Sequence, residues 1–111
     1  MEEIRVDEYV RFETGQIDKI INIECWADDD IWLVGQNSYT KTTDDVIVKH
    51  SKNIIDLIEV GDYVNGKLIH HTDIRKNSAY IYYGNGKTFV DYQIKSIVTK
   101  EMMESVEYRL N

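Results

Sequence analysis

The chain has 111 residues, 42% of them hydrophobic and 30% charged, and a net charge of −7. This composition is typical of a soluble globular protein and excludes a disordered one, and no apolar run approaches the roughly 20 residues that a membrane-spanning helix needs. The acidic start predicts no signal peptide. The single cysteine, Cys25, excludes an internal disulfide and fits a reducing cytoplasm, so we expect a buried structural thiol there.

The chain contains an imperfect internal repeat. Val6-Asp7-Glu8-Tyr9-Val10 returns as Val60-Gly61-Asp62-Tyr63-Val64, and Ser51-Lys52 returns as Thr99-Lys100. A period of about 50 residues makes each copy a supersecondary unit. A half of this size buries too little surface to be stable alone, so we expect the halves to pack as one unit or to form a homodimer. The predicted domains are residues 1–58 and 59–111.

In the first copy, short runs rich in β-branched residues alternate with turn signals. The predicted strands lie at residues 6–12, 17–26, 31–34 and 45–49. Glu13–Gln16 is predicted to be a turn, Asp28-Asp29-Asp30 a hairpin tip and residues 35–43 a polar loop. Ser51 is a good N-cap for a short helix that would end at Ile58.

The second copy repeats this plan. Asn65-Gly66 and Gly84-Asn85-Gly86 each predict a hairpin, because these residues tolerate the positive φ angles of tight turns. Further strand is expected over 93–98, and Thr99 should cap a short helix. We therefore predict a mainly β protein made of two tandem SH3-like bent antiparallel sheets or barrels, each ending in a short helix. The apolar helix positions should face the sheets: Ile54, Ile55, Leu57, Ile58, Met102, Met103 and Val106.

The acidic excess lies entirely in the first half, where residues 1–58 hold 13 acidic and 6 basic residues against 7 and 7 in residues 59–111. An acidic surface repels phosphate backbones and attracts basic proteins. The densest acidic region, around Asp28-Asp29-Asp30, could be a solvated hairpin tip, a protein-binding patch or a cation site. Trp26 and Trp32 flank it, either as core residues or as interface anchors. The predicted partner-binding residues are Trp26, Asp28, Asp29, Asp30, Trp32, Asp44 and Asp45.

An aromatic cluster around the second hairpin offers an alternative binding surface. Tyrosines beside basic side chains can stack nucleic-acid bases, although the same tyrosines are frequent in ordinary sheets. The residues of this alternative nucleic-acid site are Arg75, Lys76, Tyr80, Tyr82 and Lys87. Tyr80 and Tyr82 should share one face of their strand, and Ile81 and Tyr83 the other.

No enzyme is expected, because no residue group has the spacing that nucleophilic, metal or general acid–base chemistry requires. Neighbouring His70 and His71 would point to opposite faces of a strand, so no metal site is predicted, and no cofactor. Three function classes remain. We favour a protein-binding module for a partner with a basic surface. A nucleic-acid-binding barrel and a binder of a small ligand such as a nucleotide are the alternatives, and no membrane partner is expected.

The opening of each copy is similar to the first hairpin of SH3-like barrels. Asn-Ile-Ile-Asp-Leu-Ile-Glu-Val-Gly-Asp-Tyr-Val-Asn-Gly at residues 53–66 and Ile-Lys-Ser-Ile-Val-Thr-Lys-Glu at 94–101 resemble small phage and prophage proteins of Firmicutes. That resemblance implies a phage origin and a place in the cytoplasm of the bacterial host. Small acidic phage proteins include inhibitors of host defence, among them anti-CRISPR proteins, and by this analogy we expect such an inhibitor.

Overall fold

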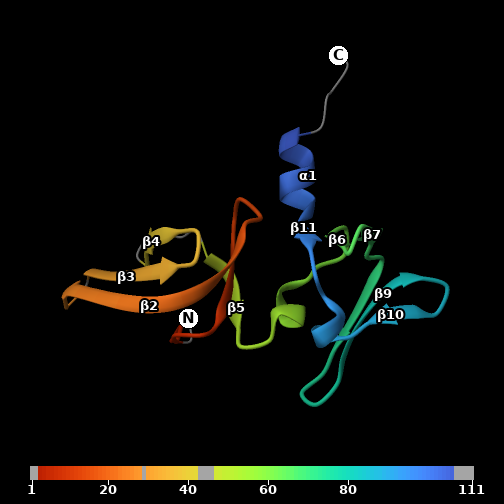
Figure 1. Cartoon of the computed structure of the whole chain (residues 1–111), viewed down its shortest axis with the longest axis horizontal. Helices are drawn as coiled ribbons and strands as arrows, with labels where there is room; N and C mark the ends of the chain where they lie inside the picture. Colours follow the sequence, from red (N-terminus) through yellow and green to blue (C-terminus); the bar gives the residue numbers. More distant parts are fainter. Residues whose placement is uncertain (1–2, 29, 43–46, 107–111) are drawn as a thin grey trace. The chain divides into compact units, whose positions relative to one another are not determined.

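The computed structural model describes residues 3–28, 30–42 and 47–106, with side chains as far as Met103 (Figure 1). It is mainly β, as predicted, and the chain divides into two compact units between Asn53 and Ile54. The division lies five residues before the predicted boundary at 58, because Ile55 and Ile58 pack in the hydrophobic core of the second unit.

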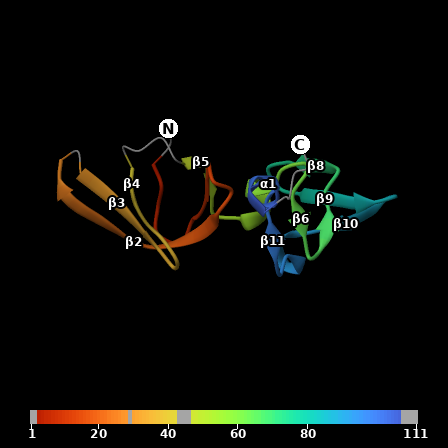
Figure 2. The same ribbon diagram turned by 90° about the horizontal axis from the view of Figure 1, so that it is seen from above.

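The first unit is a five-stranded antiparallel sheet. Its strands are β1 (Tyr9–Phe12), β2 (Ile17–Ala27), β3 (Asp30–Gly35), β4 (Tyr39–Lys41) and β5 (Ile47–Ser51). Their order in the sheet is β4-β3-β2-β1-β5. The long β2 pairs with β1 through its first residues and with β3 through the rest. Figure 2 shows its curvature beside β3. The hydrophobic core of the first unit consists of Ile4, Val10, Phe12, Ile20, Leu33 and Ile47.

The second unit has two three-stranded sheets and three short helices. Its elements are η1 (Ile54–Leu57), β6 (Tyr63–Val64), β7 (Lys67–Leu68), β8 (His71–Ile74), β9 (Ala79–Gly84), β10 (Lys87–Phe89), η2 (Asp91–Gln93), β11 (Ile97–Val98) and α1 (Lys100–Val106). The sheet orders are β10-β9-β8 and β11-β6-β7, and only Ile69 and His70 separate β7 from β8. Its core consists of Ile55, Ile58, Val64, Ile69 and Ile81.

The two units repeat the same strand order, since β6, β7 with β8, β9, β10 and β11 take the places of β1 to β5. The turn before the first strand is also the same in both units. The backbone N–H of Asp7 donates to the carbonyl of Ile20 (2.8 Å), and the backbone N–H of Gly61 donates to the carbonyl of Ile69 (2.9 Å). Both donors have a positive φ, 75° and 100°. Eleven positions separate Tyr9 from Ile20, but six separate Tyr63 from Ile69. Most of the length difference between the copies therefore lies in the first hairpin.

Several sequence predictions about the second unit hold. Asn65 (φ 54°) and Gly66 (φ 78°) form the β6–β7 turn, and β9 and β10 form the second hairpin. The side chain of Thr99 accepts the N–H of Met102 (3.4 Å) at the start of α1. In β9, Ile81 is buried with Tyr83 against the same core, while Tyr80 is exposed.

Other secondary-structure predictions are wrong. The predicted loop 35–43 contains β4, whereas only Ile97–Val98 of the predicted strand 93–98 is strand, and Gln93 ends η2. Ser51 ends β5, and the predicted helix is only the single turn η1. Within the described residues, neither unit's sheets close into a barrel, and the SH3-like assignment stays a prediction.

Two predictions of burial are also wrong. Met102 and Met103 are each 39% exposed, although Ile55, Leu57 and Ile58 are buried as expected, and the side chain of Val106 lies outside the described residues. Cys25 is exposed, because the core of the first unit extends along β2 only as far as Ile23.

Candidate functional site

Strands β2, β3 and β4 give the first unit a two-sided surface. Glu24 pairs with Trp32, and Trp32 pairs with Lys41 on the far side of β3. Directly paired residues point to the same face of a sheet, so these three side chains form a row across the strands. Ile23 and Leu33, the adjacent pair, face the core on the other side. The row therefore lies on the outer face.

Two aromatic rings are stacked on this outer face. The rings of Trp32 and Tyr39 have centroids 4.8 Å apart and an interplanar angle of 20°. Such a pair contributes about 0.5–1.5 kcal/mol beyond its buried area. The stack fixes the orientation of both rings before any partner arrives.

Carboxylates hold the polar atoms of these rings. The hydroxyl of Tyr39 donates to Glu24 Oε1 at 2.5 Å, and the indole N–H of Trp32 donates to Asp30 Oδ1 at 2.7 Å. Lys41 Nζ lies 3.6 Å from the same oxygen of Asp30. We call this surface the aromatic–acidic face; its residues are Glu24, Trp26, Asp30, Trp32, Tyr39 and Lys41.

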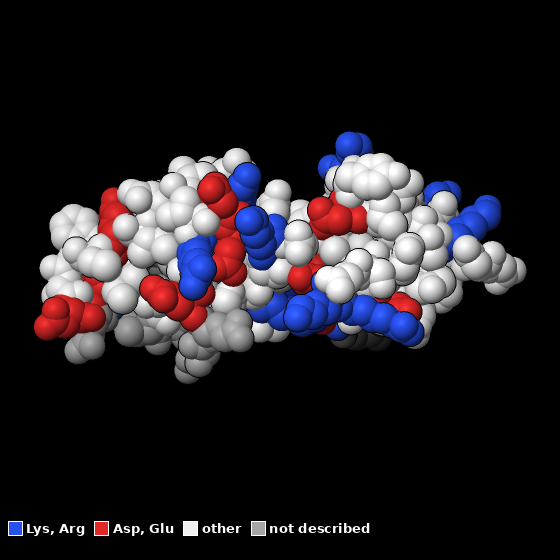
Figure 3. All heavy atoms as spheres, turned by 90° about the horizontal axis from the view of Figure 1, so that it is seen from below, with Lys and Arg blue, Asp and Glu red and all other residues white. Residues whose placement is uncertain are grey.

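The aromatic–acidic face is open to solvent. Trp26 is 68% exposed and Tyr39 51% exposed, which is unusual for large aromatic side chains. A hollow of about 260 Å³ adjoins the stacked rings. It is lined by Phe12, Thr14, Gln16, Trp32, Ser38, Tyr39, Thr40 and Lys41. Exposed carboxylates on the first unit are visible in Figure 3.

We predict that Tyr39 ionises at a higher pH than an ordinary tyrosine. Its hydrogen bond to Glu24 raises its pKa above 10.0, partial burial adds to the shift, and a hydrogen bond with Trp26 opposes it. A raised folded-state pKa gives stability that is complete below pH 10.0 and decreases as the pH rises further. Absorbance titration of the wild type should show this ionisation at high pH. Glu24→Gln should shift it to lower pH, and Tyr39→Phe should remove it. A titration that Glu24→Gln leaves unchanged would contradict the assignment.

The structure places some predicted partner-binding residues on this face. Trp26, Asp30 and Trp32 belong to it, and Asp28 lies in the turn that follows β2. Asp29, Asp44 and Asp45 lie outside the described residues. The register places Glu24, not Trp26, opposite Trp32, and a register shift follows at Cys25. Tyr39 therefore supplies the ring that stacks on Trp32.

Glu24 was not identified from the sequence as the acceptor for an aromatic hydroxyl, and neither Tyr39 nor Lys41 was identified as a site residue. The last two lie in β4, which was predicted to be loop. One signal was available: Tyr39-Thr40-Lys41 alternates a large side chain with a small one beside a hydrophobic strand.

The alternative tyrosine surface lies on the second unit, and its basic residues are dispersed. Tyr80 pairs with Asp73 and Tyr82 with His71, so a carboxylate lies among the rings. Asp73 also binds Arg75, with Oδ1 3.0 Å from Nε. Lys87 begins β10 beyond Gly84, at the other end of β9 from the Arg75–Lys76 tip. The structure does not gather the three basic residues beside the tyrosines.

No family model, curated protein or solved structure matches this chain. The assignment of a function therefore depends on the geometry of the described residues and on the sequence itself.

Two further findings concern ligands and membranes. In the part of the chain that the structure describes, no three His, Cys, Asp or Glu side chains are grouped so that they could hold a metal ion. No helix among those residues combines the length and the apolar character needed to cross a bilayer.

Proposed function

We propose that this chain is a non-enzymatic protein-binding module that docks on a basic surface of its partner through the aromatic–acidic face. The observation that carries the proposal is the exposed Trp26 on the same face as the pre-oriented Trp32–Tyr39 stack, among Glu24 and Asp30. Aromatic anchors whose rotamers are fixed in the free protein lose little entropy on binding.

The charge distribution favours a basic partner. The acidic excess of the chain lies in its first half, which carries this face. Carboxylates at the rim of an interface accelerate encounter with a positive surface, and the buried aromatic side chains slow dissociation. The resemblance to phage proteins extends the proposal to an inhibitor of a host defence complex, acting in the cytoplasm of the bacterial host.

The proposal predicts that Trp26→Ala weakens partner binding at least about tenfold, because a truncated aromatic anchor costs more than about 1.4 kcal/mol. Trp26 is 68% exposed, so its loss should leave folding intact. The partner is first captured from bacterial host lysate with the wild-type protein, identified and purified, and its dissociation constant is then measured by calorimetry. Tyr92→Ala, which removes a 78% exposed aromatic side chain from the second unit, is the matched control and should bind normally.

Asp28→Ser distinguishes electrostatic steering from contact. This substitution should slow association and reduce its salt dependence, with little change in the dissociation rate. The outcome against the proposal is a complex that tolerates Trp26→Ala and Asp28→Ser but is lost on replacement of Arg75 and Lys76. Salt-dependent binding of single-stranded DNA or RNA by those same basic residues would instead favour the nucleic-acid alternative.

A further inference from the structure

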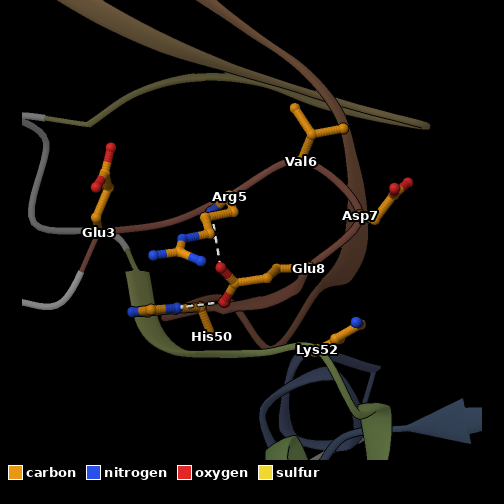
Figure 4. A pocket seen from close by; sticks show the side chains of 7 residues that line it. All are labelled: Glu3, Arg5, Val6, Asp7, Glu8, His50 and Lys52. Atoms are coloured by element: carbon orange, nitrogen blue, oxygen red, sulfur yellow. Dashed lines mark hydrogen bonds and ion pairs between the residues drawn. The ribbon is translucent and has the colours of Figure 1, made fainter.

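A second surface of the first unit has the form of a small-molecule site. A hollow of about 570 Å³ lies between the turn that precedes β1 and the end of β5 (Figure 4). Its size is within the range of ligand pockets. The lining residues are Glu3, Arg5, Val6, Asp7, Glu8, His50 and Lys52.

A hydrogen-bonded histidine and glutamate are fixed in this hollow. His50 Nδ1 lies 2.7 Å from Glu8 Oε1, and the two side chains are only 13% and 14% exposed. The other oxygen of Glu8 accepts the backbone N–H of Arg5 at 2.7 Å. An ionised carboxylate can only accept hydrogen bonds, so Nδ1 of His50 donates. Nε2 is thereby left on the opposite side of the ring, as Figure 4 shows.

The second unit shows which part of this arrangement is scaffold. Asp62 occupies the position of Glu8, and its Oδ2 accepts the N–H of Glu59 (2.7 Å), three residues earlier, as Glu8 accepts that of Arg5. Its Oδ1 accepts the backbone N–H of Lys100 (3.0 Å). The carboxylate that fastens the turn is thus common to both copies, whereas the imidazole is not.

The positions around this carboxylate differ in charge between the copies. Lys100 Nζ and Glu59 form an ion pair at 2.7 Å in the second unit, and the hydrogen bond that Lys100 donates to Glu59 raises the pKa of Lys100. In the sequence repeat, the corresponding residues of the first unit are Lys52 and Arg5, which are both cationic. By strand pairing, His50 opposite Val10 takes the place of apolar Ile97 opposite Val64. On the same backbone scaffold, the first copy has a guanidinium where the second has a carboxylate, and an imidazole where the second has an apolar side chain.

We propose that this hollow binds a compact oxyanion, a carboxylate or a phosphate group, between the guanidinium of Arg5 and Nε2 of His50. The planar guanidinium can donate two parallel hydrogen bonds to such a group. With Nδ1 donating to Glu8, Nε2 donates to the oxyanion in the imidazolium form of His50, which carries a proton on each nitrogen. Figure 4 shows the guanidinium of Arg5 above the His50 ring, extending to the same side as Nε2. Glu3 and Asp7 also line the hollow, so the rest of the ligand must be neutral or cationic.

The test follows the His50 ring signals by NMR while small probes are added to the full chain. Phosphoethanolamine carries a phosphate and glycine a carboxylate, and each also has an ammonium group for the acidic rim. At least one of them should cause a saturable shift, and their comparison identifies the oxyanion. Ethanolamine, which has the ammonium but no oxyanion, should cause none. The absence of a saturable shift with both oxyanion probes, or an equal shift with ethanolamine, overturns the proposal.

Variants locate the site. Arg5→Gln removes the guanidinium but keeps the backbone N–H that Glu8 holds, so the turn should persist while the probe binds about tenfold more weakly. Lys19→Gln removes an equal charge from β2, outside the lining residues, and should bind like the wild type. If Lys19→Gln weakens binding as much as Arg5→Gln, the effect is general electrostatics and the proposed site is wrong.

Discussion

Gly35→Ala should destabilise the first unit by about 3 kcal/mol or more, since it combines overpacking with damage to a buried polar network. Gly35 ends β3, and a Cβ atom there would lie 2.3 Å from Oδ2 of Asp18 and 2.5 Å from the hydroxyl of Ser38. Asp18 is 4% exposed and accepts hydrogen bonds from the backbone of Lys19 and Asn37 and from Ser38. The carboxylate cannot move away without losing them. Urea unfolding followed by circular dichroism measures the loss.

Gly84→Ala is the matched control for this prediction. Gly84 ends β9, the strand that takes the place of β3 in the second unit, and a Cβ there would meet only the flexible side chain of Lys87, at 3.4 Å. The substitution should change the free energy of unfolding by less than about 0.5 kcal/mol. Equal losses at Gly35 and Gly84 would show that the backbone freedom of glycine, rather than the Asp18 contact, determines the cost.

The sequence predicts the β architecture because its signals are local. Asn65-Gly66 fits positive φ angles, and Ile17–Ala27 carries enough β-branched residues to identify β2. Local signals fail where pairing partners decide the outcome. The three residues of β4 become a strand because β3 offers them an open edge, and η2 shortens its neighbours because the side chain of Gln93 bonds the backbone of Val90 (2.9 Å).

The candidate site was predictable in part for the same reason. Two tryptophans beside a run of acids are visible in the sequence, so Trp26, Asp30 and Trp32 were found. The partners that orient them depend on register. A shift of one residue along β2 would replace Glu24 by Ile23 or Cys25 opposite Trp32, and only the paired strands show which register is present. The Glu8–His50 contact joins residues 42 positions apart and has no sequence signal at all.

Asp62→Asn should destabilise the second unit by about 2–4 kcal/mol, because a buried donor loses its acceptor. Asp62 is fully buried. One carboxylate oxygen accepts the backbone N–H of Glu59 (2.7 Å), and the other accepts the backbone N–H of Lys100 (3.0 Å). The asparagine has the same shape but only one oxygen. Its amide group must therefore face one of the two backbone N–H groups, donor against donor. Urea unfolding measures the total cost, and amide hydrogen exchange at Glu59 and Lys100 shows which contact is lost.

Asp91→Asn provides the control that separates this mechanism from a general effect of lost charge. The Asp91 side chain accepts one backbone N–H that is described, that of Ile55, through Oδ1 (3.0 Å), and the residue is exposed. Its asparagine variant can keep that acceptor and turn the new amide to water, so the free energy of unfolding should change by less than about 1 kcal/mol. The two substitutions remove equal charge from the same unit. Similar losses would mean that charge accounts for the stability that Asp62 contributes, and not its two hydrogen bonds to the turn and to α1. The structural role assigned to Glu8, the corresponding carboxylate of the first unit, would then lose its support.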